Sequence, residues 1–247
     1  MGQFLHHFGR YLLLLQRTIA KPEKASIYWR EIAQQMVAFG IGSVGIVIIT
    51  SVFLGAVITV QTAFQLTTPL IPDSTIGSIV TNSSILEMAP TVVCLILAGK
   101  IGSNVASEIG TMRISEQIDA LEIMGVNAAS YLIMPKIIAA VVMIPCLVII
   151  SGFLCIVSGL AVGQITGIVS AQDFMLGSTS FFIPFTVTFA LIKATTFGFI
   201  ISTVAAYYGY YTEGGALEVG CCRLSGLVLI RNARSPHRQS RPLAYRR

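Results

Sequence analysis

The stretch EMAPTVVCLILAGK, residues 87–100, is followed by SEIGTMRISEQIDALEIMG, residues 107–125, and then by a second apolar run that starts near Tyr131. A membrane-spanning helix needs about 20 predominantly apolar residues, because every backbone N–H and C=O must be satisfied inside the bilayer. The middle segment instead concentrates charge, with Arg113 standing among four acidic residues. This order predicts two spanning helices joined by a short segment in water.

The overall composition is that of an integral membrane protein. Hydrophobic residues make up 54% of the 247-residue chain and charged residues 11%, with a mean hydropathy of +0.79. The formal net charge of +5 comes from the end of the chain, because seven of the sixteen basic residues are arginines after position 220. The rest of the chain has no basic face with interleaved aromatic residues, which argues against nucleic-acid binding. We therefore expect an all-α membrane protein.

Four apolar stretches are long enough to span a bilayer. They cover about residues 36–60, 85–102, 131–165 and 181–210. Lysine and arginine alternate between the connecting segments: five basic residues fall between positions 10 and 30, none in 61–84, three in 100–136 and none in 164–182. This bias predicts that the amino terminus and the charged segment after the second span lie inside, and that the other two links lie outside.

The amino terminus does not resemble a signal peptide, since its apolar core is short and no small-residue cleavage site follows. It is better explained as an amphipathic helix lying at the membrane interface. Its basic side carries Arg10 and Arg17. Its apolar side carries Phe4, Leu5, Phe8, Tyr11, Leu12 and Leu15.

The charged inner segment has the signals of a short helix. We expect Ser115 to cap a helix over residues 116–124 and Gly125 to end it in a left-handed conformation. Glu116 and Asp119 would lie in its first turns, where the helix dipole favours acidic groups. Ile118, Leu121 and Met124 form a small apolar stripe. The stripe suits docking of a soluble partner, but equally an ordinary loop helix packed on its own bundle.

Two charged residues fall where a membrane makes them costly. Lys193 lies more than ten residues into the fourth span, and Glu87 opens the second span from the outer side. A lysine near mid-bilayer costs about 2.5–3.5 kcal/mol, so Lys193 needs a carboxylate, water or an anionic headgroup. Pairing with Glu87 is one hypothesis, and a purely structural role in helix packing is the other.

Small residues recur every four positions late in the third span, at Gly159, Gly163 and Gly167. Such spacing predicts a flat strip for close packing against another helix.

No catalytic constellation is present in the sequence. His6, His7 and His237 lie near the two ends, away from any intramembrane nucleophile or carboxylate pair. The chain has no GxxxxGK[ST] loop for a nucleotide, so a nucleotide that powers transport would bind elsewhere. The five cysteines lack the spacing of a metal site, and we expect neither a metal nor a structural disulfide.

Residues 87–136, from EMAPTVV to YLIMPK, resemble the signature of the MlaE (YrbE) family, the permease subunit of ABC lipid transporters. Residues 21–64 are similar to the first region of that family, and residues 191–220 are similar to its fourth span and the turn beyond. The resemblance covers roughly residues 10–220. It divides the chain into an interfacial helix and linker (1–30), a permease transmembrane domain (31–220) and an atypical arginine-rich tail (221–247).

The resemblance implies a function and a set of partners. A homodimer of the permease lies in the bacterial inner membrane as a multi-pass protein and moves phospholipids between the inner and outer membranes, which maintains outer-membrane lipid asymmetry. Each permease binds an ATPase subunit on the inside, which holds the ATP and Mg²⁺, and a ring of MCE-domain proteins on the outside. A non-transporting anchor for such a ring is the alternative function. A lipid-modifying enzyme is a third class, but the chain lacks a nucleophile–base set.

The resemblance also assigns site residues. Glu87 and Lys193 match charged positions near the family's lipid cavity, although Leu86 stands where the family often has arginine. The segment 108–125 matches the coupling helix that docks in the ATPase. Its candidate residues are Glu108, Gly110, Thr111, Met112, Arg113, Glu116, Asp119, Leu121, Met124 and Gly125.

The carboxyl-terminal end departs from the family, which continues after GGALEVG into a fifth span. Here the longest uncharged run, residues 224–230, is too short to cross a bilayer, so we expect four spans. The tail has seven arginines and no lysine or acidic residue. A shifted reading frame or a truncated gene would explain this composition, and a natural basic tail attracted to anionic lipid is the alternative.

Overall fold

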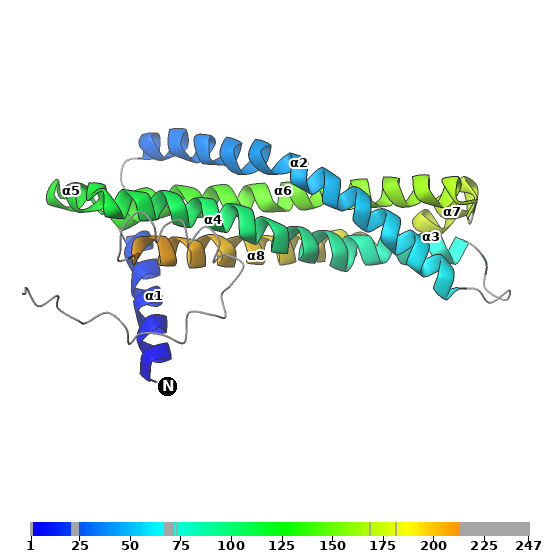
Figure 1. Cartoon of the computed structure of the whole chain (residues 1–247), viewed down its shortest axis with the longest axis horizontal. Coiled ribbons are helices and arrows are strands. Elements are labelled where there is room, and N and C mark those ends of the chain that lie inside the picture. Colours follow the sequence, from blue (N-terminus) through cyan, green and yellow to red (C-terminus); the bar gives the residue numbers. More distant parts are fainter. Residues whose placement is uncertain are drawn as a thin grey trace, which may run out of the picture.

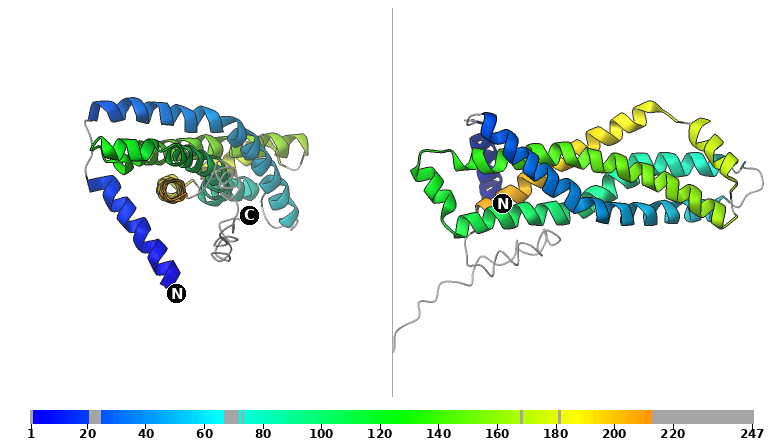
Figure 2. Two further views of the ribbon diagram at one scale, coloured as in Figure 1. Left: turned by 60° about the vertical axis from the view of Figure 1, so that its left-hand side comes forward. Right: turned by 90° about the horizontal axis from the view of Figure 1, so that it is seen from above.

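A computed structural model of the protein describes residues 2–20, 25–66, 72, 74–167, 169–180 and 182–212. Within these residues every regular element is a helix and no strand is present. Long helices lie side by side in an elongated bundle, and α1 (Gly2–Ala20) crosses the long axis of the bundle steeply near one end (Figure 1; Figure 2). The expected all-α membrane fold is confirmed. The predicted tail, residues 221–247, lies outside the described residues.

Four helical segments in the described part of the chain are long and apolar enough to cross a membrane, as expected. They are Tyr28–Gln65, Ser74–Ile114, Ala128–Ile165 and Pro184–Tyr210. Three of them belong to single helices, α2 (Ala25–Gln65), α6 (Ala128–Ile165) and α8 (Pro184–Tyr210). With 41 and 38 residues, α2 and α6 are about twice the length that crosses a hydrocarbon layer, so both tilt or extend beyond it.

The second span is a composite of three helical pieces. It consists of α3 (Ser74–Ser83), the π-helix η1 (Ser84–Val92) and α4 (Val93–Ile114). Pro90 lies inside η1, and a proline has no N–H to give and clashes with the carbonyl four residues earlier. Widening the helix by one residue accommodates the ring. The apolar pattern of residues 85–102 does not predict this π-helix.

The link between the first two spans is shorter than the expected residues 61–84, because most of these residues are helical. Helix α2 continues to Gln65 and α3 already begins at Ser74. The polar residues of α3 are helical because α3 packs closely on α7 (Ala171–Ser180), at the end of the bundle opposite α5 (Figure 1). A Cβ at Gly77 would collide with the backbone of Phe174, and one at Gly177 with the carbonyl of Ser74.

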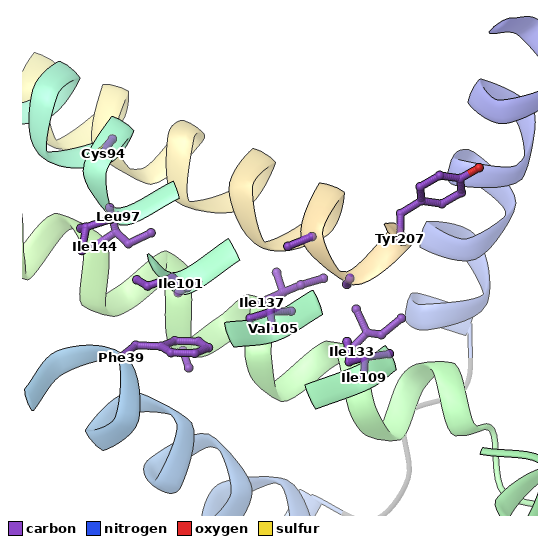
Figure 3. Packing of buried hydrophobic residues seen from close by; sticks show 14 of the residues in the cluster. Phe39, Cys94, Leu97, Ile101, Val105, Ile109, Ile133, Ile137, Ile144 and Tyr207 are labelled. Carbon is purple, nitrogen blue, oxygen red and sulfur yellow. The ribbon is translucent and has the colours of Figure 1, made fainter. Parts of the chain in front are cut away.

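The main core lies between α4, α6 and α8 (Figure 3). One face of α4 supplies side chains four residues apart, which a helix aligns in a row. They pack in a cluster with isoleucines of α6. The α4 residues are Leu97, Ile101, Val105 and Ile109, and the α6 residues include Ile133, Ile137 and Ile144. Outward-facing apolar side chains such as Phe53 and Leu95 are exposed, as expected for a surface solvated by lipid.

The predicted glycine strip of the third span meets α2 most closely at Gly159, its first glycine. A Cβ at Gly159 would lie 2.6 Å from Oγ1 of Thr59, whereas one at Gly163 would lie 3.7 Å from Cγ2 of Thr59, an ordinary contact. Gly167 does not extend the strip. It lies beyond the end of α6, with φ of 67° and no neighbour near its Cβ position. The strip is therefore shorter than the spacing suggested.

Helix α1 rests on the bundle along one edge and leaves apolar side chains free. Leu14 is 4% exposed, and the Tyr11 hydroxyl donates a hydrogen bond of 2.8 Å to Oγ1 of Thr203 in α8. On the remaining surface of α1, Leu5 and Phe8 are exposed. The exposed apolar side chains suit a helix that lies in the membrane interface.

Candidate functional site

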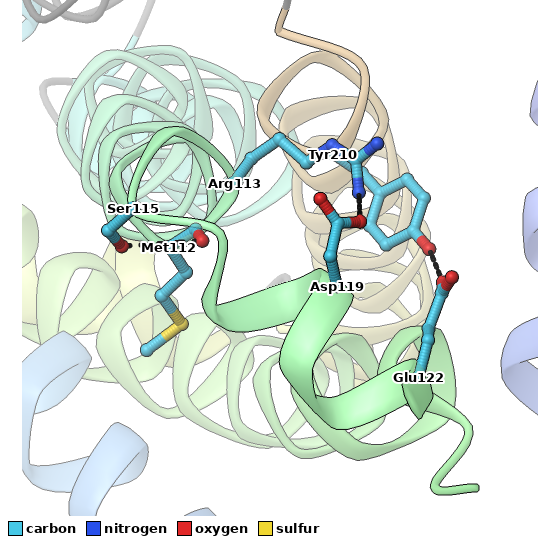
Figure 4. Close-up of polar contacts among 6 residues, drawn as sticks. All are labelled: Met112, Arg113, Ser115, Asp119, Glu122 and Tyr210. Carbon is cyan, nitrogen blue, oxygen red and sulfur yellow. Dashed lines mark hydrogen bonds and ion pairs between the residues drawn. The ribbon is translucent and has the colours of Figure 1, made fainter. Parts of the chain in front are cut away.

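The charged segment folds into a short helix, α5 (Gln117–Ile123), at the same end of the bundle as α1 (Figure 1; Figure 4). The predicted cap is wrong. The Ser115 hydroxyl donates to the carbonyl of Thr111 at 2.8 Å, so it belongs to the last turn of α4. Glu116, expected in the first helical turn, precedes α5 in a left-handed conformation with φ of 57°. Ser115 bonds back to the preceding turn because a serine hydroxyl competes well for a carbonyl four residues earlier.

The end of α5 agrees with the expected geometry. Gly125 has φ of 81°, a conformation that favours glycine. Asn127 then caps α6, accepting a hydrogen bond of 3.4 Å from the backbone N–H of Ser130. The Asn127 side-chain amide also donates to the carbonyl of Arg17 at 2.9 Å, which ties α1 to the α5–α6 turn. Asn127 was not among the predicted residues, although an asparagine immediately before an apolar run is a typical signal for the start of a helix.

The apolar stripe of α5 is mostly used inside the bundle. Ile118 is fully buried in the main core, and Leu121 packs against it. For these two residues the second interpretation, a helix packed on its own bundle, describes the structure. Met124 is 68% exposed and stands beside Ile123, which is 87% exposed and was not singled out from the sequence. The exposed apolar tip of α5 is therefore this pair.

Polar contacts attach α5 to the ends of α4 and α8 (Figure 4). Arg113 forms an ion pair with Asp119 at 2.6 Å, and its guanidinium lies 5.9 Å from the ring centre of Tyr210. The Tyr210 hydroxyl donates to Oε1 of Glu122 at 2.9 Å. A half-exposed ion pair contributes at most about 1 kcal/mol by itself, but together these contacts fix the orientation of α5. Tyr210 and Glu122 were not among the predicted site residues.

Glu108 faces the interior of the bundle. Its Oε2 lies 2.6 Å from Nζ of Lys136, whose side chain is 3% exposed. Its Oε1 accepts a hydrogen bond of 3.3 Å from Gln35, which also donates to Glu31 at 3.2 Å. These contacts connect α2, α4 and α6. Glu108 is therefore part of a polar network between helices rather than of the exposed surface of α5.

The other predicted coupling residues before Arg113 lie in the last turns of α4. Gly110 is buried and Met112 is half-buried against the core. Thr111 is exposed, but its hydroxyl donates to the carbonyl of Ser107 at 2.8 Å. Of the predicted set, the residues on α5 and its two flanking turns are Glu116, Asp119, Leu121, Met124 and Gly125.

The two charged residues expected near a lipid cavity lie on different helices. Glu87 is exposed on η1 and Lys193 is half-buried on α8. The ion pairs found among the described residues do not include Glu87 with Lys193, so the hypothesis of that pair is not met in this structure. No group of three or more metal-ligating side chains occurs in the described part of the chain.

Comparison of the sequence with known proteins identifies the family of this chain. The model of the family described as "Permease MlaE" matches residues 32–230, which includes the first ten residues of the expected tail. A protein of Rickettsia bellii named "Probable ABC transporter permease protein" is 34% identical over 230 residues, covering 92% of this chain and 86% of its own.

Two further relatives, from Synechocystis and from Arabidopsis thaliana, have similar sequence identity to this chain. A "Probable ABC transporter permease protein" of Synechocystis is 34% identical over 196 residues, covering 77% of this chain and 72% of its own. The chloroplastic protein TRIGALACTOSYLDIACYLGLYCEROL 1 of Arabidopsis thaliana is 32% identical over 217 residues, covering 88% of this chain and 62% of its own. The family match and the four membrane-crossing segments of the described chain show a multi-pass membrane protein that belongs to the MlaE permease family.

Proposed function

We propose that this chain is the membrane subunit of an ABC transporter that moves phospholipids between the inner and outer membranes of a bacterium. In this proposal two copies form a homodimer in the inner membrane. An ATPase subunit, which binds ATP and Mg²⁺, docks on the cytoplasmic side, and a ring of MCE-domain proteins docks on the outer side. The names of the Rickettsia and Synechocystis relatives support the transporter class.

The observation that carries the proposal is the apolar tip of α5. Ile123 and Met124 are 87% and 68% exposed at one end of the bundle. The helix that bears them is held in place through Asp119 and Glu122. An exposed apolar pair on a helix of fixed orientation suits the docking of a soluble partner. Burying the two side chains at the interface is favourable, and the helix loses little conformational entropy when the partner binds. Force applied there reaches α4 and α8 directly.

The charged residues within the spans support an anionic lipid as cargo. Lys193 is half-buried on α8 without a carboxylate within ion-pair distance in the described chain. An ammonium in such a position gains most from an anionic group that enters the membrane with its own apolar tails, as a phospholipid does. In a homodimer the exposed Glu87 and the half-buried Lys193 of each copy line one shared chamber in this proposal.

Coupling is tested by comparing two matched double variants co-expressed with the ATPase subunit. I123S/M124S removes the tip of α5, and I165S/M175S removes two apolar side chains of similar exposure, 85% and 60%, at the other end of the bundle. ATP-dependent transfer of a fluorescent phospholipid between proteoliposomes is measured. We expect I123S/M124S to lose transfer by about tenfold or more and to lose ATPase binding, and I165S/M175S to retain ATPase binding. Equal ATPase binding in both variants would contradict the docking role of α5.

The same assay separates a transporter from a non-transporting anchor. A transporter moves lipid only with ATP, whereas an anchor assembles the outer ring without ATP-dependent transfer. Mass analysis of lipid extracted from the purified complex identifies the cargo, and recovery of a sterol instead of phospholipid would overturn the cargo assignment.

A further inference from the structure

A polar cavity of about 230 Å³ opens where α1 meets the ends of α4, α5 and α8. Arginines from two of these helices reach it, together with the acidic side chain of α5 that bonds Tyr210. The residues that line it are Arg10, Arg17, Arg113, Glu122, Tyr210, Tyr211 and Thr212. The cavity is separate from Glu87 and Lys193 and from the exposed tip of α5.

The charges around this cavity are not balanced. Arg113 is neutralised by Asp119, and Glu122 accepts the hydrogen bond of Tyr210. Arg10 lies over the ring of Tyr211, with 4.1 Å between the guanidinium carbon and the ring centre. No carboxylate within the described residues lies at ion-pair distance from Arg10 or Arg17. Glu122 keeps its negative charge, because a hydrogen bond from a tyrosine does not neutralise a carboxylate. The positive charges of Arg10 and Arg17 therefore exceed the negative charge of Glu122 by one around this cavity, which favours an anion.

The position of the cavity relates it to the membrane surface. It lies at the end of the spanning helix α8, where four tyrosines cluster, as aromatic residues do at headgroup depth. On α1, Leu5, Phe8 and Leu12 are exposed apolar side chains that fit the layer just below the headgroups. A guanidinium fork matches the oxygens of a phosphate group, and the cavity is smaller than the roughly 300–1,000 Å³ of sites that enclose whole ligands. It suits a headgroup whose tails stay in the bilayer.

We infer that this cavity binds the phosphate of an anionic phospholipid from the leaflet that α1 contacts, with Arg10 and Arg17 as its principal ligands. The bound lipid joins α1 to the helices that carry α5. This site does not depend on the identity of the cargo, because it lies at the membrane surface rather than within the spans. Binding at this site and the transport proposed above are tested by separate measurements.

The test uses the full-length chain in detergent and native mass spectrometry of bound lipid. Phosphatidylglycerol is titrated against wild type, R10Q, R17Q and R30Q. Arg30 is the matched control, because like Arg17 it is exposed, but it lies on α2 and does not line the cavity. Within the described residues Arg17 forms no ion pair that the substitution would remove, and melting temperatures show whether the variants fold. The arginine-rich tail is identical in all four proteins and contributes equally.

We expect R10Q and R17Q each to weaken phosphatidylglycerol binding about fivefold, with R30Q at the wild-type value. Phosphatidylcholine should bind more weakly than phosphatidylglycerol in wild type and lose this difference in R10Q/R17Q. Equal weakening in R30Q, or no weakening in R17Q, would overturn the site. Inorganic phosphate at millimolar concentration is the second arm: if it displaces the lipid completely, the site takes a free anion and the lipid assignment is wrong.

Discussion

The Nζ of Lys136 lies 2.6 Å from Oε2 of Glu108, and the two ends of this ion pair differ in exposure, with 3% for the lysine side chain and 33% for the carboxylate side chain. The pair bridges α4 and α6. Within the described residues no other anion lies at ion-pair distance from the lysine, whereas the carboxylate is partly exposed and also bonds Gln35, so the two partners depend on each other unequally.

This inequality predicts unequal mutant effects. E108Q leaves a buried ammonium without its anion and should lower the stability by about 3 kcal/mol or more. K136M leaves a carboxylate that is a third exposed and keeps Gln35, and should cost about 1 kcal/mol. Thermal unfolding in detergent measures both. The double variant E108Q/K136M should be more stable than E108Q alone, and equal losses for the two single variants would refute the asymmetry.

Close approach of α2 and α6 predicts opposite effects for two glycines in one helix. In G159A the new methyl group meets Oγ1 of Thr59 at 2.6 Å and the Val80 side chain at 3.3 Å, so overpacking should lower the stability by about 1–3 kcal/mol. In G163A the nearest atoms are 3.7 Å and 4.0 Å away, and the higher helix propensity of alanine should make the variant neutral or more stable. The melting temperatures of G159A and G163A measure these two effects. A G159A protein as stable as G163A would show that the helices separate easily.

The left-handed Glu116 allows its backbone and side-chain roles to be separated. A non-glycine residue at φ of 57° pays about 1–2 kcal/mol, so E116G should raise stability and the β-branched E116V should lower it. If the Glu116 carboxylate contacts the ATPase, E116G should also uncouple ATP hydrolysis from lipid transfer despite its greater stability. Melting temperature and coupled transfer are measured on the same preparation. If the E116G protein is stable and fully coupled, the Glu116 side chain has no role in coupling, and the residue serves only in the turn between α4 and α5.

The predicted orientation is tested by labelling thiols in intact cells. In a background with the five native cysteines replaced by serine or alanine, I123C and I165C place similarly exposed thiols at opposite ends of the bundle. A membrane-impermeant maleimide should label I165C in cells whose outer membrane has been opened, and should label I123C only after the inner membrane is lysed. The reverse pattern would place α5 on the outer side and remove the basis of the coupling proposal.

Properties that depend on local composition were predictable from the sequence. The number of spans follows from apolar length, and the end of α5 follows from Gly125, because neither requires knowledge of a distant contact. The helical character of residues 74–83 was not predictable in this way. It depends on the backbone contact of Gly77 with Phe174, almost one hundred residues away in the chain.

The candidate site was likewise predictable only in part from the sequence. That a short helix follows the second span could be inferred, but which of its apolar residues face water could not. Ile118 and Ile123 are equally apolar, and only the packing of α5 on the core makes one buried and the other exposed. Likewise Ser115 has the side chain of a helix cap, yet the preceding turn of α4 supplies its acceptor first.

The double role of Asn127 has a mechanical consequence. One side-chain atom starts α6 and another holds the last turn of α1 through the carbonyl of Arg17. In the transport proposed above, a movement of α5 would therefore be transmitted through Asn127 to α1, the helix whose exposed apolar side chains suit the membrane interface. The Asn127 amide acts beside the hydrogen bond from Tyr11 to Thr203, so α1 is attached both to the α5–α6 turn and to α8, and a displacement of either changes its position against the bundle.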